Sequence, residues 1–167
     1  MVQNMQRVDR LILFNTLVYP DFSWGVKLFV LATLLPGVKH WLSSPSGVKW
    51  AIQFGIHQKD KITDEAIKQY QAPFIDKNAR KALLKSIHRL SPRGYQEIAD
   101  KIVDYQGPVQ LLYGQEDRIL PKVATTMQRV KEDLPQAQLK AFPNCGHFLQ
   151  EEIPQELSAV VLAFMES

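Results

Sequence analysis

Short apolar runs alternate with helical periodicity over the C-terminal part of this 167-residue chain. Two of these runs, at 109–113 and 137–142, have the length and composition of strands buried in a parallel sheet. Apolar residues three and four positions apart occupy the segments before, between and after them, at 95–105, 121–134 and 153–165. Alternation of strand and helix predicts parallel strands with helices packed on both faces of the sheet, so the expected fold class is α/β.

The upstream sequence divides into two further parts. Residues 8–14 form a short apolar run bounded by charged and polar residues, which predicts another strand. From Tyr19 onward strand-like runs disappear, and helical segments are separated by Pro, Gly and Ser, with Thr63 as one expected helix N-cap. We expect three parts in the chain. Residues 1–16 end the first part of a sheet core, residues 17–94 form a helical cap, and residues 95–167 complete the core.

Composition and charge exclude several classes of protein. The longest apolar stretch, 28–35, is far shorter than the roughly 20 residues that span a bilayer. Lys and Arg number 12 against 5 Asp and Glu over 17–95, and 6 against 11 over 96–167. No nucleic-acid-binding module accompanies the basic part, so we interpret the asymmetry as a basic helical layer on an acidic one. The single Cys145 cannot form an internal disulfide, which predicts a reducing, cytoplasmic compartment.

An acidic residue and a histidine follow the two C-terminal strands. Asp117 comes just after the first strand, and His147 comes after the second within Pro-Asn-Cys-Gly-His-Phe. Because the carboxyl ends of parallel strands meet at one edge, the two side chains can meet there. Asp117 would accept a hydrogen bond from one ring nitrogen of His147 and leave the other as a base near neutral pH. The pair is two-thirds of a nucleophile–His–acid triad, and Gly146 is expected to allow a tight turn before the histidine.

Structural roles are open for the same residues. His147 could be a hydrogen-bonded core histidine, and Asp117 could cap the helix that follows Pro121. Glu151 and Glu152 are expected to favour the N-terminus of the last helix, where negative charge is stabilising. The other histidines show no metal-ligand spacing, and Cys145 is expected to be a buried apolar side chain, not a nucleophile.

These motifs resemble the α/β-hydrolase fold. Gly114-Gln-Glu-Asp117 is similar to the acid turn of that fold, and Pro-Asn-Cys-Gly-His147-Phe followed by Glu-Glu-Ile-Pro154 is similar to its histidine loop and last helix. The resemblance covers nearly the whole chain, from the sixth strand of the fold onward. It implies Asp117 as the acid and His147 as the base, with no cofactor and no metal.

Within the fold, the motifs are most similar to haloalkane dehalogenases and epoxide-hydrolase-like enzymes. The strand ending at Asn15-Thr16 resembles the one before their helical cap, and Tyr70-Gln-Ala-Pro-Phe74 resembles a cap segment of the dehalogenases. In some dehalogenases the acid is a Glu at the end of the strand before the cap, but Asn15 stands there in this chain. The resemblance implies a small-molecule substrate such as a haloalkane, an epoxide or an ester.

Aromatic residues are frequent in the expected cap, and each could be a core residue or a substrate contact. Together they favour a small, apolar substrate. The residues assigned to substrate binding are Trp24, Trp41, Tyr70 and Phe74.

The sequence departs from the fold in one respect. Neither Gly-x-Ser-x-Gly nor Gly-x-Asp-x-Gly, the elbows that carry a nucleophile, occurs in the chain. We therefore expect a C-terminal portion of a longer hydrolase that is inactive by itself and self-associates through an exposed sheet edge. An Asp nucleophile would favour halide or epoxide chemistry, and a Ser would favour ester hydrolysis. The alternative is a non-catalytic binding or interaction protein, or a truncated pseudoenzyme.

Overall fold

The computed structural model describes residues 4–167, so the first three residues of the segment 1–16 lie outside the described part. Three parallel strands form one sheet in the order β1-β2-β3. The strands are β1 (Leu11–Phe14), β2 (Val109–Gly114) and β3 (Gln138–Phe142). Leu11 lies opposite Val109, and Gly114 lies opposite Phe142. The carboxyl ends of all three strands therefore point to the same edge.

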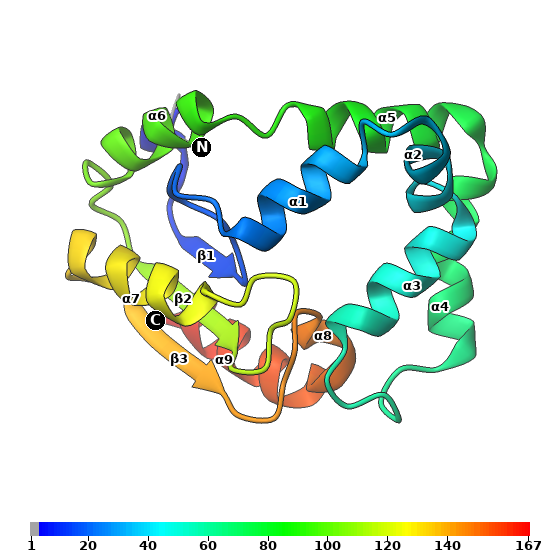
Figure 1. Cartoon of the computed structure of the whole chain (residues 1–167). Coiled ribbons are helices and arrows are strands. Elements are labelled where there is room, and N and C mark those ends of the chain that lie inside the picture. Colours follow the sequence, from blue (N-terminus) through cyan, green and yellow to red (C-terminus); the bar gives the residue numbers. More distant parts are fainter. Residues whose placement is uncertain (1–3) are drawn as a thin grey trace.

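Helices surround the sheet and extend away from it (Figure 1). The helices near the sheet are a 3₁₀ turn η1 (Met5–Arg7), α6 (Pro92–Ile102), α7 (Val123–Asp133), α8 (Leu149–Glu152) and α9 (Pro154–Glu166). The helices between β1 and α6 are α1 (Trp24–Ala32), α2 (Pro36–Leu42), α3 (Pro45–Gly55), α4 (Asp64–Gln71), the 3₁₀ turn η2 (Ala72–Ile75) and α5 (Lys77–His88). No strand interrupts this second group within residues 4–167. Parallel strands with flanking helices make the fold α/β, as the sequence predicts.

Capping side chains explain where several helices begin. A Ser, Thr or Asp side chain accepts a backbone N–H of the first turn at Ser23, Ser44, Thr63, Asp76 and Ser91. The Thr63 hydroxyl accepts the N–H of Ala66 at 3.1 Å, which confirms the predicted N-cap. The predicted boundaries differ from the observed ones by up to three residues. The strand expected over 8–14, for example, is Leu11–Phe14.

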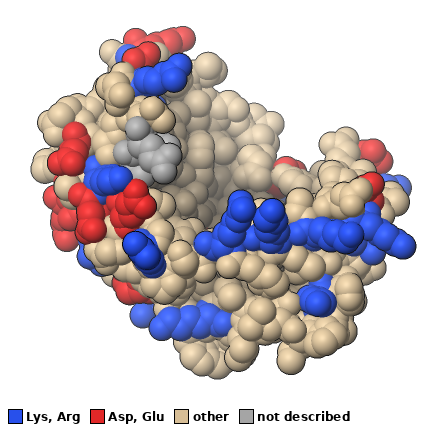
Figure 2. Space-filling model, turned by 90° about the horizontal axis from the view of Figure 1, so that it is seen from above, with Lys and Arg blue, Asp and Glu red and all other residues tan. Residues whose placement is uncertain are grey.

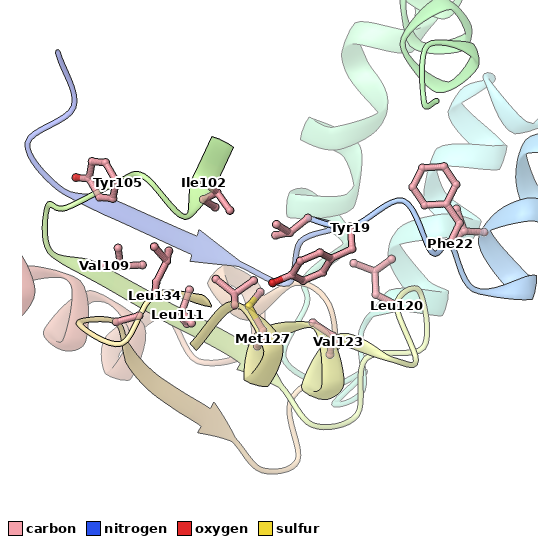
Figure 3. Close-up of a cluster of buried hydrophobic side chains, with 14 residues drawn as sticks. Tyr19, Phe22, Ile102, Tyr105, Val109, Leu111, Leu120, Val123, Met127 and Leu134 are labelled. Carbon is pink, nitrogen blue, oxygen red and sulfur yellow. The ribbon is translucent and has the colours of Figure 1, made fainter. Parts of the chain in front are cut away.

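Successive residues of β2 belong to two hydrophobic clusters on opposite faces of the sheet, because side chains alternate between the faces of a strand. Leu111 belongs to a cluster with Val123 and Met127 of α7, and Figure 3 shows these side chains gathered between the sheet and that helix. Leu112 belongs to a second cluster, which includes Leu157 of α9. The central strand is thus buried on both faces.

Charge is distributed unevenly over the surface. Figure 2 shows Lys and Arg side chains gathered over α5, with Asp and Glu side chains around the end of the molecule where α6 lies. Helix α5 alone contains Lys77, Arg80, Lys81 and Lys85. Within residues 4–167, none of the helices combines the length and apolar character needed to cross a bilayer.

Candidate functional site

Asp117 and His147 are brought together at the carboxyl edge of the sheet. Asp117 lies in the turn after β2, and His147 lies in the loop between β3 and α8. Because β2 and β3 are adjacent and parallel, both loops leave the sheet side by side. The distance from Asp117 Oδ2 to His147 Nδ1 is 2.8 Å. The predicted juxtaposition of these two side chains is therefore present.

Both oxygens of the Asp117 carboxylate accept hydrogen bonds. Its side chain is fully buried, and Oδ1 accepts the backbone N–H groups of Ile119 and Leu120, each at 2.8 Å. Asp117 does not cap the helix after Pro121, because α7 begins at Val123 without a side-chain cap. Oδ1 instead binds the turn before that helix and leaves Oδ2 for the histidine. A carboxylate can only accept hydrogen bonds, so the proton of this pair lies on Nδ1 of His147. This arrangement selects one tautomer and one ring orientation.

The other ring nitrogen of His147 is left available. Among residues 4–167 no hydrogen bond joins Nε2 to a protein group, and the side chain is 23% exposed. The ring of Phe148 packs edge-on against the imidazole, with centroids 5.1 Å apart. A neutral imidazole with a bonded Nδ1–H and a free Nε2 can accept a proton from a nucleophile or a water.

Asn15 fastens the histidine loop to the sheet. It follows β1, adopts a positive φ of 33° and is 5% exposed. Its side-chain N–H groups donate to the carbonyl oxygens of Gly146 (3.1 Å) and His147 (2.7 Å), and its Oδ1 accepts the N–H of Gly114 (3.0 Å). One side chain therefore joins the ends of β1 and β2 to the loop. This role of Asn15 is not predicted from the sequence, where Asn15 is notable only because some dehalogenases have an acidic residue at that position.

Glycines permit the close contacts around this loop. A Cβ on Gly114 would lie 2.2 Å from the Gly146 carbonyl oxygen, and one on Gly146 would lie 2.2 Å from the Gly55 carbonyl oxygen. Gly146 has no positive φ, and the left-handed residue of the loop is Asn144, with φ of 53°. The expectation that Gly146 serves a tight turn is therefore wrong. Its lack of a side chain lets the end of α3 approach the loop.

Cys145 is a buried apolar side chain, as predicted. It is fully buried against Leu112, Phe142 and Leu149. Burial, reinforced by the negative charge of Glu152, raises the pKa of its thiol to about 12. The thiolate that a cysteine nucleophile requires is therefore strongly disfavoured near neutral pH.

The two glutamates after the histidine contact α4 and the segment after α3 instead of serving α9. Glu151 Oε1 accepts the hydroxyl of Tyr70 on α4 at 2.7 Å. Glu152 is 3% exposed and accepts the backbone N–H groups of His57, Gln58 and Gly146. The role expected for them at the last helix is not observed, because α8 orients both carboxylates toward the segments around α3 and α4.

The four residues predicted to bind substrate occupy different surroundings. Tyr70 lies nearest the site, because its ring packs 6.3 Å from that of Phe148, the neighbour of His147. Trp41 on α2 packs against Trp50 on α3, with centroids 5.8 Å apart. Trp24 is 77% exposed at the start of α1, and Phe74 is half-buried in η2. Within residues 4–167, Tyr70 packs against the histidine loop, and no hydrogen bond or aromatic contact joins Trp24, Trp41 or Phe74 to that loop.

Aromatic residues outside that predicted set continue toward the histidine loop. Trp50 stacks on Phe54 with ring centroids 5.3 Å apart, and both rings are partly exposed. Phe54 immediately precedes Gly55, whose carbonyl oxygen accepts the His147 N–H at 2.8 Å. Their four-residue spacing on one helix face is the sequence signal that links these two rings. In the described part of the chain, no group of three or more His, Cys, Asp or Glu residues is arranged to hold a metal ion.

Curated proteins similar to this chain are hydrolases. The uncharacterized hydrolase YugF of Bacillus subtilis (strain 168) is 31% identical over 133 residues, which cover 77% of this chain and 45% of YugF. A 2-hydroxy-6-oxononadienedioate/2-hydroxy-6-oxononatrienedioate hydrolase of Pseudomonas putida is 29% identical over 76 residues, covering 46% of this chain and 26% of that enzyme. The chain thus spans less than half the length of both relatives. No family model matches it.

Solved structures with the same fold cover almost the whole chain. The meta-cleavage product hydrolase CumD from Pseudomonas fluorescens IP01 superposes with a TM-score of 0.75 at 19% identity, over 99% of this chain and 58% of CumD. An α/β-hydrolase fold protein from Burkholderia ambifaria superposes with a TM-score of 0.70 at 24% identity, over 93% of this chain and 56% of that protein. The sheet, the surrounding helices and the strand-end loops described above are therefore part of a larger known fold.

Proposed function

Since this chain belongs to the α/β-hydrolase superfamily, we propose that Asp117 and His147 are the acid and the base of a nucleophile–His–acid triad. The observation that carries the proposal is the 2.8 Å contact between Asp117 Oδ2 and His147 Nδ1. The second oxygen of Asp117 is occupied by two backbone N–H groups, so the carboxylate cannot turn away from the imidazole. His147 Nε2 is the atom that would take the proton.

The chemistry assigns one task to each residue. His147 accepts a proton at Nε2 from the attacking hydroxyl or water and returns it to the leaving group. Asp117 stabilises the imidazolium that forms and keeps Nδ1 protonated throughout. Phe148 and the backbone of Gly55 support the ring and the loop from the cap side.

We place the nucleophile on polypeptide outside these residues. Neither elbow pattern occurs in the 167 residues, and the chain covers 58% of the CumD structure it matches. A hydrolase active site assembled in this way needs the remaining part of the fold to supply both the nucleophile and the groups that stabilise an oxyanion. By itself, the chain would then have an acid and a base without turnover.

The substrate class that the relatives favour is a 2-hydroxy-6-oxo-dienoate or another meta-cleavage product. The P. putida enzyme is named for 2-hydroxy-6-oxononadienedioate and 2-hydroxy-6-oxononatrienedioate, and CumD is named a meta-cleavage product hydrolase. None of the four proteins compared is named as a haloalkane dehalogenase or an epoxide hydrolase. Haloalkanes, epoxides and esters remain the alternatives that the motif resemblance suggests. The nucleophile separates them, because an Asp suits carbon–halogen and epoxide bonds, whereas a Ser suits acyl-type substrates.

The test begins with the coding sequence upstream of Met1. An in-frame Gly-x-Ser-x-Gly or Gly-x-Asp-x-Gly would support the hydrolase, and a stop codon in its place would favour the non-catalytic alternative. The encoded enzyme is then assayed with a 2-hydroxy-6-oxo-dienoate, a haloalkane, an epoxide and a nitrophenyl ester. We expect His147→Ala and Asp117→Asn to remove at least about 10³-fold of kcat, as loss of triad members does, whereas His40→Ala on the exposed face of α2 retains activity.

A matching assay of the 167 residues alone tests whether the nucleophile lies outside them. We expect no release of dienoate products, halide, diol or nitrophenol from this chain. Turnover that His147→Ala abolishes would contradict the placement of the nucleophile elsewhere. Turnover that survives His147→Ala in the complete enzyme would contradict the triad itself.

An interaction role is the second candidate. Several large apolar side chains of α1 and α2 are exposed, including Trp24 (77%), Leu31 (58%) and Trp41 (46%). Within the described residues β1 pairs with β2 alone, so one edge of β1 is open to another strand. We expect the 167-residue chain to self-associate. A sharp monomer peak in size-exclusion chromatography, independent of concentration, would contradict this.

A further inference from the structure

Glu152 is a buried carboxylate without a cationic partner among residues 4–167. It ends α8, five residues after His147, and its side chain is satisfied by backbone N–H groups. A buried carboxylate is costly unless hydrogen bonds compensate for its lost hydration. Three charge-assisted hydrogen bonds, each stronger than a neutral one, provide that compensation here.

The two oxygens of Glu152 contact different parts of the molecule. Oε1 accepts the N–H of Gly146 at 2.8 Å, directly before His147. Oε2 accepts the N–H of Gln58 at 2.8 Å and that of His57 at 3.1 Å, both just after α3. The carboxylate therefore joins the end of a cap helix to the peptide that precedes the proposed base.

We propose that Glu152 is a positioning residue that couples the cap to His147, an inference that rests on the proposed function of His147 as the base. The loop is held from the sheet side by Asn15, which binds the carbonyl oxygens of Gly146 and His147. It is held from the cap side by Glu152 and by the Gly55 carbonyl oxygen, which accepts the His147 N–H. A displacement of α3 is transmitted to the imidazole through these cap-side bonds.

Close packing leaves the loop little freedom to absorb such a displacement. A Cβ on Gly146 would lie 2.8 Å from Glu152 Oε1 and 2.8 Å from the His57 nitrogen. A side chain at Gly146 would therefore overlap both groups, so no free space separates the loop from them. An interface packed in this way shifts as a unit.

Glu151 supplies the matched control. It is the preceding residue in α8, and it also joins this helix to the cap, through the Tyr70 hydroxyl on α4. Within the described residues, its side chain makes no hydrogen bond to the histidine loop. Loss of Glu151 should therefore loosen cap docking at α4 and leave the Gly146–His147 peptide in place.

The experiment compares Glu152→Gln with Glu151→Gln in the ¹⁵N-labelled 167-residue chain. Glutamine offers a donor where an acceptor is required, so it cannot satisfy both the Gly146 and the His57–Gln58 N–H groups. We expect amide hydrogen exchange at Gly146, His57 and Gln58 to accelerate about tenfold or more in Glu152→Gln. The Nδ1–H resonance of His147, shifted downfield by Asp117, should move or broaden. In Glu151→Gln both readouts should match the unmodified chain.

An unshifted Nδ1–H resonance in folded Glu152→Gln would overturn the coupling, as would equal changes in both variants. If Glu152→Gln does not fold by circular dichroism, Glu152→Asp replaces it. The shorter carboxylate retains the charge and cannot reach both sets of donors, so the same resonance should still shift. None of these readouts requires turnover. Failure of the coupling is thereby distinguished from failure of the triad, which His147→Ala tests in the complete enzyme.

Discussion

The side-chain amide of Asn15 lies 2.7 Å from the carbonyl oxygen of His147, a residue 132 positions later in the chain. The same side chain also binds the N–H of Gly114 and the carbonyl oxygen of Gly146. The hydrogen bonds of Asn15 thus fix the position of the histidine loop relative to the strand ends, and the hydrogen bond to Asp117 fixes the orientation of the His147 ring. The proposed base is oriented by two buried side chains that play no direct part in proton transfer.

Two replacements of Asn15 should distinguish the contribution of its hydrogen bonds to stability from that of its positive φ. Asn15→Gly loses three hydrogen bonds and retains access to positive φ, so we expect the free energy of unfolding to fall by about 2–4 kcal/mol. Asn15→Ala adds the cost of a left-handed alanine, about 1 kcal/mol more. Urea denaturation of both variants measures the difference. Equal stabilities would show that the φ of 33° carries no strain in this loop.

Asp117→Asn should weaken the fold as well as the site. An amide placed at Asp117 cannot accept from His147 and from Ile119 and Leu120 in the observed geometry, so a buried N–H loses its acceptor. We expect the free energy of unfolding to fall by about 1–3 kcal/mol, the cost of an unsatisfied buried group. Glu116→Gln, at an exposed neighbour, is the control and should be nearly neutral. Equal effects in thermal or urea denaturation would contradict the buried network.

The glycines of the chain should differ sharply in their tolerance of alanine. In Gly146→Ala the new Cβ would lie 2.2 Å from the Gly55 carbonyl oxygen, so we expect a loss of about 3 kcal/mol or more, or failure to fold. Gly37→Ala, in α2 with no atom within 4 Å of the new Cβ, should be neutral or stabilising by about 0.5–1 kcal/mol. Melting temperatures of the two variants measure this contrast. A tolerated Gly146→Ala would contradict the close approach of α3 to the histidine loop.

Stability should fall at alkaline pH because of Cys145. Burial raises its pKa from 9.0 to about 12, so the unfolded chain ionises first as the pH rises. The stabilisation is complete below pH 9 and is lost between pH 9 and about 12, with a slope of at most about 1.4 kcal/mol per pH unit.

Cys145→Ala removes this contribution and is the control, so its unfolding free energy should depend less on pH over the same interval. Modification of the native chain by a thiol reagent at pH 8 should also require unfolding. Rapid modification under native conditions would show that the thiol is accessible.

The positions of Asp117 and His147 could be predicted because each follows a recognisable strand. Strand length, apolar composition and the parallel arrangement are properties of short segments, and together they place both strand ends at one edge. The supporting residues could not be predicted in this way. Asn15 and Glu152 look like ordinary polar residues beside a strand and a helix, and their partners are up to 132 positions away.

Gly146 shows the same limit at a single residue. A glycine before a functional histidine suggests a turn, but the positive φ belongs to Asn144, and Gly146 is required by the approach of Gly55. That approach depends on where α3 ends, and α3 lies almost a hundred residues upstream. The surroundings of the residues predicted to bind substrate have the same dependence, since Trp24 is 77% exposed and Tyr70 is half-buried.

The sequence by itself determined the α/β class, the order of strands and helices, and the proposed acid and base that follow two strands, because periodicity and strand-end residues act over a few positions. Only the tertiary structure decided how the histidine loop is held between Asn15 and Glu152, which glycines must lack a side chain, and which aromatic residue reaches Phe148. Those relationships depend on groups that become neighbours only after the helices between β1 and α6 have packed against the sheet and its loops.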